Sequence, residues 1–134
     1  MGTKIFVNLP VKDLDRTIKF FTKLGYKFNA QFTNENATSL IISDDIYIML
    51  LTEPFFKNFT KKSIVDATKS TEAIICLSAE TREEVDSLVK KALDAGGTTP
   101  NTPQDHGWMY QHGYQDLDGH LWEIAYMDMS KMPQ

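Results

Sequence analysis

The chain has 134 residues, a formal net charge of −4 and 42% hydrophobic residues. A chain of this length buries on the order of 70% of its unfolded surface, so we expect a single domain with its own core. The acidic balance and the absence of a basic stripe argue against nucleic acid, no apolar run approaches the ~20 residues of a membrane span, and no secretory signal pattern is visible. We therefore expect a cytoplasmic protein that binds neither nucleic acid nor membrane.

The only cysteine of the chain, Cys76, has no partner for an internal disulfide. A lone thiol in an acidic chain fits a reducing cytoplasm. A catalytic cysteine needs a neighbouring group that lowers its pKa, and the sequence supplies none. We therefore expect Cys76 to be a small buried residue.

The first part of the chain predicts one strand, one helix and three further strands. Residues 4–11, "KIFVNLPV", are rich in β-branched and aromatic residues, as in a strand. Residues 12–25 follow with a helical period, a cap at Asp13 or Asp15 and an end at Gly25. The predicted buried stripe of this helix is Leu14, Ile18, Phe21 and Leu24. The segments "YKFNAQFTN", "ATSLIIS" and "IYIMLLTE" then read as strands separated by polar turns.

The second part repeats this order. Residues 72–79, "EAIICLSA", predict a strand. Residues 81–97 predict a helix with a capping box, Thr81 at its start and Glu84 three residues later. Its predicted buried stripe is Val85, Leu88, Val89, Ala92 and Leu93. A loop rich in Pro, Asn and Gly then leads to two strands, "WMYQHGYQD" and "HLWEIAYMD", joined by a turn at Asp118-Gly119.

The order strand-helix-strand-strand-strand thus occurs twice. Repeat one covers about 3–53, a linker about 54–70 and repeat two about 71–128, with one short helix expected around Ile64 to Ala67. The predicted fold class is α+β: two βαβββ repeats form a curved, mostly antiparallel sheet. Helices on one face of that sheet would leave the other face open as a concave cup.

Two stretches, "NLPVKDLDRTIKFFTKLGYKF" near the start and "YQDLDGHLWEIAY" near the end, carry a family resemblance. The chain resembles the vicinal oxygen chelate superfamily, which includes glyoxalase I, bleomycin-resistance proteins, fosfomycin-modifying transferases and extradiol dioxygenases. More narrowly, it is similar to a bacterial branch labelled predicted lactoylglutathione lyase. The resemblance covers nearly the whole chain and implies one glyoxalase-like domain over residues 1–134 and a homodimer.

The alternation of strand side chains assigns residues to the two sheet faces. In "HLWEIAY", Trp122, Ile124 and Tyr126 would pack under a helix, whereas Leu121 and Glu123 would face the cup. The same argument places these residues on the cup side: Phe6, Asn8, Tyr47, Met49, Leu51, Glu72, Ile74 and Cys76.

The resemblance implies that metal ligands project from four cup positions, which are usually occupied by histidine or glutamate. Here these positions are Phe6, Met49, Glu72 and Glu123. Zinc and nickel sites normally include imidazole ligands, whereas Glu72 and Glu123 with water would suit Mg²⁺ or Mn²⁺. Two carboxylates in an apolar cup would share a proton, bind a divalent metal ion or bind a cationic ligand.

Two functions follow as hypotheses. The first is small-molecule binding, with apolar walls from Phe6, Tyr47, Met49, Ile74 and Leu121 and polar anchors from Asn8, Glu72 and Glu123. The second is a divalent-metal-dependent lyase or isomerase of the lactoylglutathione lyase type, in which Glu123 is the catalytic residue that moves a proton. The phenylalanine at position 6, where the family has an imidazole, favours binding.

Other candidate residues have simpler interpretations. His120 has the opposite strand parity to Glu123 and is expected to fix the turn before the last strand. His106 and His112 are not spaced as a ligand cluster. The aromatic residues Phe55, Phe56 and Phe59 of "PFFKNF" would form a lid over the cup, a dimer interface or part of the core.

Overall fold

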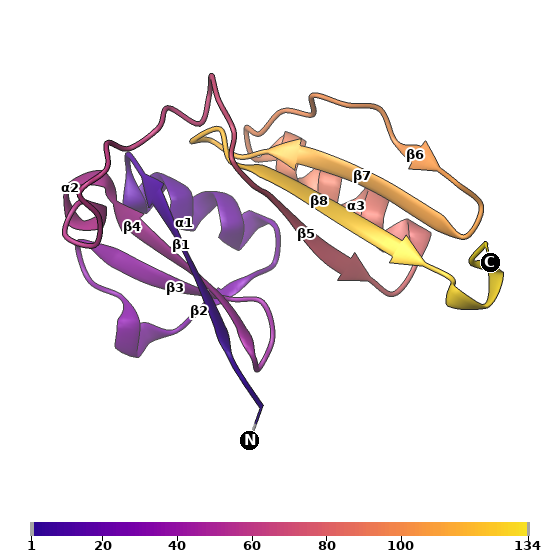
Figure 1. Cartoon of the computed structure of the whole chain (residues 1–134), viewed down its shortest axis with the longest axis horizontal. Coiled ribbons are helices and arrows are strands. Elements are labelled where there is room, and N and C mark those ends of the chain that lie inside the picture. Colours follow the sequence, from indigo (N-terminus) through magenta and orange to yellow (C-terminus); the bar gives the residue numbers. More distant parts are fainter. Residues whose placement is uncertain (1, 134) are drawn as a thin grey trace. The chain divides into compact units, whose positions relative to one another are not determined.

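The computed structural model describes residues 2–133 and divides the chain into two compact units, Met1–Val65 and Asp66–Gln134 (Figure 1). The first unit contains β1 (Ile5–Val11), α1 (Leu14–Lys23), β2 (Lys27–Phe28), a 3₁₀ turn (Ala30–Phe32), β3 (Ala37–Ile41), β4 (Ile46–Thr52) and α2 (Glu53–Phe56). The second contains β5 (Ile74–Ala79), α3 (Arg82–Asp94), β6 (Gln104–Asp105), β7 (Met109–Gln115), β8 (Leu121–Met127) and a 3₁₀ turn (Met129–Lys131). The predicted α+β class with two βαβββ repeats is confirmed.

The two units share one strand topology. Their strand orders are β1-β4-β3-β2 and β5-β8-β7-β6. The first strand of each unit pairs parallel with the last, and the other neighbours pair antiparallel. The predominance of antiparallel pairing agrees with the prediction. The strands form two four-stranded sheets, one in each unit.

Both long helices begin at the predicted caps. The Asp13 carboxylate accepts a 3.1 Å hydrogen bond from the Arg16 amide at the start of α1. At the start of α3, the Thr81 hydroxyl accepts from the Glu84 amide at 3.1 Å. The Glu84 carboxylate accepts a hydrogen bond from the Glu80 amide at 3.0 Å. In a standard capping box it would accept from the amide of the next residue, the N-cap Thr81. These side chains satisfy amides that have no partner within the helix.

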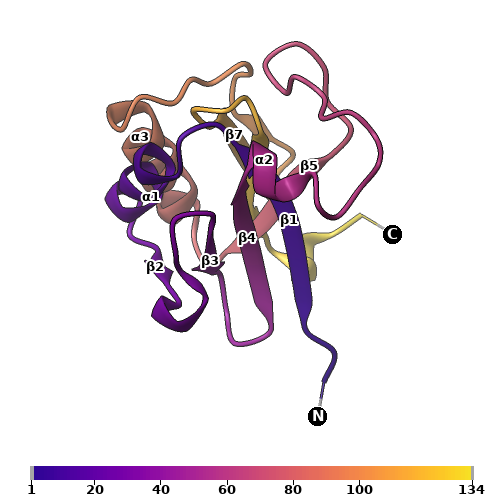
Figure 2. The ribbon, with the colours of Figure 1, turned by 90° about the vertical axis from the view of Figure 1, so that its left-hand side faces the viewer.

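The core of the first unit lies where α1 meets the sheet (Figure 2). It includes Phe20, Phe21, Leu24, Leu40, Ile48 and Leu50, all at most 3% exposed. The rings of Phe20 and Phe21 pack edge to face at 4.9 Å. The predicted stripe omitted Phe20 and Thr17, which are buried, and included Ile18, which is only half-buried. The buried stripe of α1 is therefore wider than predicted.

In the second unit, α3 packs against β5, β7 and β8. The rings of Tyr114 and Trp122 stack there with centroids 6.2 Å apart, and both side chains are 1% exposed. Val85, Val89 and Ala92 are the buried helix residues. The prediction that Leu93 is buried is wrong: it is 39% exposed because it lies beyond the edge of this stripe.

Three local predictions differ from the structure. The linker helix lies at Glu53–Phe56 instead of around Ile64 to Ala67, and Pro54 in its first turn favours that start. The predicted strand over residues 26–34 is reduced to Lys27–Phe28, because Asn29 caps a 3₁₀ turn instead. The loop over residues 98–107 contains the short strand β6.

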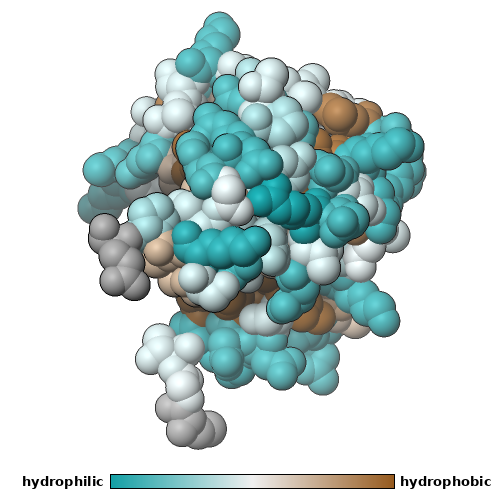
Figure 3. Space-filling model, turned by 90° about the vertical axis from the view of Figure 1, so that its right-hand side faces the viewer, coloured by the Kyte–Doolittle hydropathy of each residue, from teal (hydrophilic) through white to brown (hydrophobic). Residues whose placement is uncertain are grey.

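None of the helices among residues 2–133 is long and apolar enough to cross a membrane. One side of the surface, shown in Figure 3, is covered mainly by hydrophilic residues with separate small apolar areas.

Candidate functional site

The sheet face opposite α1 carries the predicted site residues of the first unit. Phe6 pairs in register with Tyr47, and Asn8 pairs with Met49. Because α1 covers the alternate residues, these four side chains share the other face. The rings of Phe6 and Tyr47 stack at 5.1 Å with an interplanar angle of 12°, and Phe6 is 52% exposed. The face thus combines a partly open aromatic pair with the amide of Asn8.

Polar contacts with Lys4 and with the loop before β4 position the Tyr47 side chain. Its hydroxyl donates to the Asp44 carbonyl at 2.7 Å, and the Lys4 ammonium donates to the same carbonyl at 2.6 Å. Lys4 also pairs with the Asp45 carboxylate at 3.2 Å and lies 5.8 Å from the centroid of the Tyr47 ring. These exposed contacts contribute little stability individually, but together they orient the tyrosine.

Glu123 lies on the corresponding face of the second unit. Its register partners are Cys76 on β5 and Gly113 on β7, and Leu121 pairs with the exposed Ile74. A side chain at Gly113 would place a Cβ 2.5 Å from the Trp122 carbonyl oxygen and 3.3 Å from Cγ of Glu123. Gly113 therefore leaves space for the half-buried Glu123 side chain next to β7.

Glu72 lies outside the sheet. The prediction that it begins a strand is wrong, because β5 begins at Ile74. The Thr71 hydroxyl donates to the Ala73 carbonyl at 3.0 Å, so a local turn occupies the backbone there. Glu72 is exposed in this turn.

Cys76 is exposed, so the expectation that it is buried is wrong. It is on the edge strand β5, next to Glu123 in the neighbouring strand. Partial burial, followed by the negative charge of Glu123, raises the pKa of the Cys76 thiol. The thiol form is therefore favoured, in contrast to the lowered pKa of a nucleophilic cysteine.

The side chains at the four positions implied for metal ligands do not form a donor set. Phe6 has no donor atom, Met49 offers a thioether, and Glu72 lies before its strand. Within the described part of the chain, no group of three or more His, Cys, Asp or Glu side chains could hold a metal ion. Metal binding by Glu72 and Glu123 stays a prediction.

The Asp-Gly turn before β8 is built around a buried carboxylate. Asp116 is 6% exposed and accepts hydrogen bonds from the amides of Asp118 and His120, both at 3.0 Å, and from Trp122 Nε1 at 2.9 Å. Burial raises the pKa of Asp116, and the positive charge of His120 and these hydrogen bonds oppose that effect. His120 lies in this turn, where the sequence placed it.

The other two histidines make polar contacts with neighbouring residues of the second unit. His112 Nε2 lies 3.1 Å from the Thr99 hydroxyl and 3.1 Å from the Asn101 carbonyl. His106 Nε2 lies 3.4 Å from the Gln104 side-chain oxygen. His112 thus contacts oxygens of the loop before β6, and His106 contacts a side-chain oxygen of β6.

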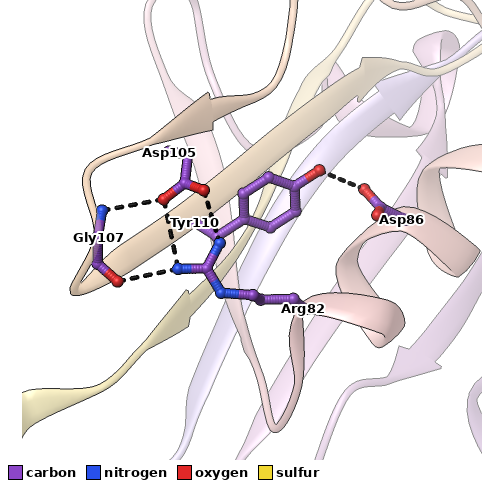
Figure 4. A network of polar contacts seen from close by, with 5 residues as sticks. All are labelled: Arg82, Asp86, Asp105, Gly107 and Tyr110. Carbon is purple, nitrogen blue, oxygen red and sulfur yellow. Dashed lines mark hydrogen bonds and ion pairs between the residues drawn. The ribbon is translucent and has the colours of Figure 1, made fainter.

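Sequence reasoning missed a polar network centred on Arg82 (Figure 4). Its guanidinium donates to both carboxylate oxygens of Asp105, at 2.8 and 3.3 Å, and to the Gly107 carbonyl at 2.9 Å. It also lies over the Tyr110 ring at 5.2 Å, and the Tyr110 hydroxyl donates to Asp86 at 2.5 Å. The hydrogen bond from Arg82 lowers the pKa of Asp105. The network joins the start of α3 to β6 and β7.

The aromatic residues after β4 are partly packed. α2 contacts β1 and β4, and Phe55 and Phe56 are half-buried. Phe59 packs edge to face on Phe55 at 5.4 Å but is 64% exposed. A role for these phenylalanines as a lid or a dimer interface stays a prediction.

The duplicated topology agrees with a match to a known protein family. A family model for the glyoxalase/bleomycin resistance protein/dioxygenase superfamily matches residues 5–124. The chain belongs to this superfamily. A comparison with curated proteins found no match.

Several solved structures have the same fold. The chain is 30% identical to hypothetical protein SA1046 from S. aureus, with 94% of each chain covered and a TM-score of 0.79. It is 16% identical to a glyoxalase-related enzyme from Fulvimarina pelagi, covering 94% of this chain and 88% of that one, with a TM-score of 0.80. For FosX, a fosfomycin resistance protein from Listeria monocytogenes, the identity is 19%, the coverage 100% and 95%, and the TM-score 0.67. The last two likenesses show the fold alone.

Proposed function

We propose that this superfamily member binds small organic molecules on the face of each unit's sheet that lies opposite its long helix, α1 or α3. The observation that carries the proposal is Glu123, a half-buried carboxylate on the same sheet face as the paired residues Ile74 and Leu121, with space left for it by Gly113. Ligand sites typically combine such apolar walls with a few placed polar groups. In the first unit the proposed walls are Phe6, Tyr47 and Met49, and the proposed anchor is Asn8. In the second unit the proposed walls are Ile74 and Leu121, and the proposed anchors are Glu123 and, from the turn before β5, Glu72.

The anchors favour a cationic ligand or one rich in N–H groups. A partly desolvated carboxylate gains most from a partner that donates hydrogen bonds or carries positive charge. Glu123 has only the thiol of Cys76 and the glycine Gly113 as its register partners, so the adjacent strands bring no cation beside it.

The test is a ligand-observed NMR screen of small aliphatic and aromatic amines against wild type, Glu123→Gln and Glu80→Gln. Glu80 is an exposed glutamate at the end of β5 and serves as the matched control. Amines that bind wild type and Glu80→Gln should bind Glu123→Gln at least several-fold more weakly. Unchanged binding to Glu123→Gln, or no amine binding at all, would contradict the anchor role.

A divalent-metal-dependent lyase or isomerase is the second candidate. It is favoured by the half-buried carboxylate of Glu123, which would supply one oxygen ligand, with Glu72 as the second. Metal per chain would be measured by elemental analysis of protein purified without chelators or affinity metals, and again after incubation with Mn²⁺, Ni²⁺ or Zn²⁺. Near-stoichiometric metal that is lost in Glu72→Gln/Glu123→Gln would support this function, and a metal-free protein throughout would refute it.

We further infer a homodimer in the cytoplasm. The dimer rests on the superfamily resemblance and on the prevalence of two-fold symmetry among oligomers. The compartment rests on the exposed Cys76 thiol, which would be kept reduced there. Light scattering coupled to size exclusion tests the first, and a monomer at micromolar concentration would exclude it.

A further inference from the structure

Ser39, on β3, is buried without a hydrogen bond. Its side chain is 1% exposed, and its hydroxyl has no hydrogen-bond partner within residues 2–133. The next residue, Thr38, is equally buried, but its hydroxyl is paired with that of Thr33 at 2.8 Å. Buried polar groups are nearly always paired, so an unpaired one calls for an explanation.

The register places Ser39 on the face that carries the aromatic pair. Ser39 pairs with Met49, and Met49 pairs with Asn8 on the other side. Thr38 points to the opposite face, toward α1, because strand side chains alternate. Ser39 therefore belongs to the proposed ligand-binding face of the first unit.

Ser39 is within reach of a ligand that packs against Phe6 and Tyr47. Tyr47 lies on the adjacent strand, two residues from Met49, so Ser39 and Tyr47 are diagonal neighbours. Such neighbours are about 7–8 Å apart, roughly the length of a fused bicyclic ring. A planar ring against the exposed Phe6 and its partner Tyr47 could thus extend to Ser39.

Met49 is the register neighbour of Ser39 on β4. It is half-buried and lies between Ser39 and Asn8 in the register. A methionine side chain is unbranched and changes rotamer at low cost, so it adapts readily to a neighbouring group. A rotamer change at Met49 is therefore the movement that we expect to admit a ligand to Ser39.

We propose that Ser39 is the hydrogen-bonding anchor for a planar nitrogen heterocycle that packs against Phe6 and Tyr47. A heterocyclic N–H would donate to the Ser39 hydroxyl, or a ring nitrogen would accept from it. The ligand thereby pairs the hydroxyl that is unpaired in the free protein. This inference rests on the proposed function and specifies the ligand class for the first unit.

The experiment uses two pairs of probes with matched shape: indole with benzothiophene, and quinoline with naphthalene. Each is titrated into the full-length ¹⁵N-labelled chain, and dissociation constants are obtained from amide shifts of β1, β3 and β4. In wild type the nitrogen compound should bind about three- to tenfold tighter than its partner, the range of one net hydrogen bond. In Ser39→Ala this preference should vanish, and the thermal midpoint should stay the same or rise because no hydrogen bond is lost.

Thr38→Val is the matched control. It removes a paired hydroxyl from the α1 side of the same strand, so it should lower the thermal midpoint and keep the preference for nitrogen. If Ser39→Ala does not fold, Ser39→Cys replaces it, because a thiol is a weak hydrogen-bonding group of similar shape. Equal binding within each pair in wild type, or a preference that survives in the Ser39 variant, would refute the Ser39 anchor alone. Failure of all four probes to shift the sheet amides would refute ligand binding on this face as well.

Discussion

Trp122 Nε1 donates a 2.9 Å hydrogen bond to the carboxylate of Asp116, and both side chains are almost completely buried. This bond joins the turn before β8 to the core beneath α3. The same carboxylate accepts the amides of Asp118 and His120. The turn that leads into the strand of Glu123 is thus fixed by one side chain.

Asp116→Ala should destabilise the protein by about 2–4 kcal/mol, because it leaves buried donors, including the Trp122 indole, without an acceptor. Asp116→Asn should cost less, since its amide oxygen still accepts one of these bonds. Urea unfolding followed by tryptophan fluorescence measures both variants. Equal stability of Asp116→Ala and wild type would mean that the three hydrogen bonds make no net contribution to the free energy of unfolding.

The pH dependence of stability should differ between Asp116 and Asp105. Burial raises the pKa of Asp116 above the usual 3.8, so its folded state holds the proton more tightly, and its stabilising contribution is lost as pH rises through the folded pKa. The pKa of Asp105 is lowered by Arg82, so its contribution is present above pH 3.8 and is lost as pH falls through the folded pKa. Urea unfolding from pH 3 to 8 should show wild type losing stability relative to Asp116→Asn with rising pH. Relative to Asp105→Asn, wild type should lose stability below about pH 4. A slope of the opposite sign in either comparison would contradict the assigned cause.

Gly119→Ala should destabilise the protein by about 2–4 kcal/mol, combining backbone strain with a steric clash. Gly119 has a φ of +94°, and an added Cβ would lie 2.5 Å from the Thr68 amide nitrogen and 2.6 Å from the Ala67 carbonyl carbon. Gly25 is the matched control, because its φ is +100° but no atom lies within 4 Å of an added Cβ. Gly25→Ala should therefore cost only about 1–2 kcal/mol, the strain alone. Chemical denaturation separates the two, and equal losses would show that the contact with residues 67–68 is relieved without cost.

Arg82→Lys should loosen the segment between β6 and β7 although the charge is kept. Lysine cannot bind both oxygens of Asp105 and the Gly107 carbonyl as the planar guanidinium does. Hydrogen exchange of a peptide covering residues 104–110 should be faster in Arg82→Lys, and faster still in Arg82→Ala. The α1 peptide is the internal reference, and unaltered exchange in both variants would indicate that the segment is held by other contacts.

Glu123→Gln should make the Cys76 thiol more acidic. Partial burial raises the pKa of the thiol first, and the charge of Glu123 raises it further, so only the second contribution is removed. The pH midpoint of Cys76 modification by a disulfide reagent should shift to lower pH in Glu123→Gln and stay in place in Glu80→Gln. Identical midpoints in all three proteins would show that Glu123 does not influence Cys76.

Local sequence patterns predicted the elements because local physics determines them. The caps at Asp13 and Thr81 and the alternation of Trp122 and Ile124 with Leu121 and Glu123 depend on neighbours in sequence. Strand parity likewise predicts that Phe6 and Tyr47 share one face, where their rings stack.

Features that depend on distant contacts were not predictable in the same way. Arg82 and Asp105 are separated by a helix and a loop, and no local pattern relates them. Ser39 appears as an ordinary polar strand residue, and its burial follows only from the packed neighbours of β3. The position of Glu72 depended on where β5 begins, and the Thr71 side chain bonds the backbone just before that point.

The parallel pairing of the first and last strand in each unit also constrains how the chain folds. β1 obtains its sheet partner only when Ile46 and the rest of β4 are in place, and β5 waits in the same way for Leu121 and β8. Each unit must therefore close a long loop before its first strand is fixed, which is slow compared with hairpin formation. During synthesis β1 would stay unpaired until β4 has left the ribosome, and the first unit could then complete its sheet before any residue of β8 exists.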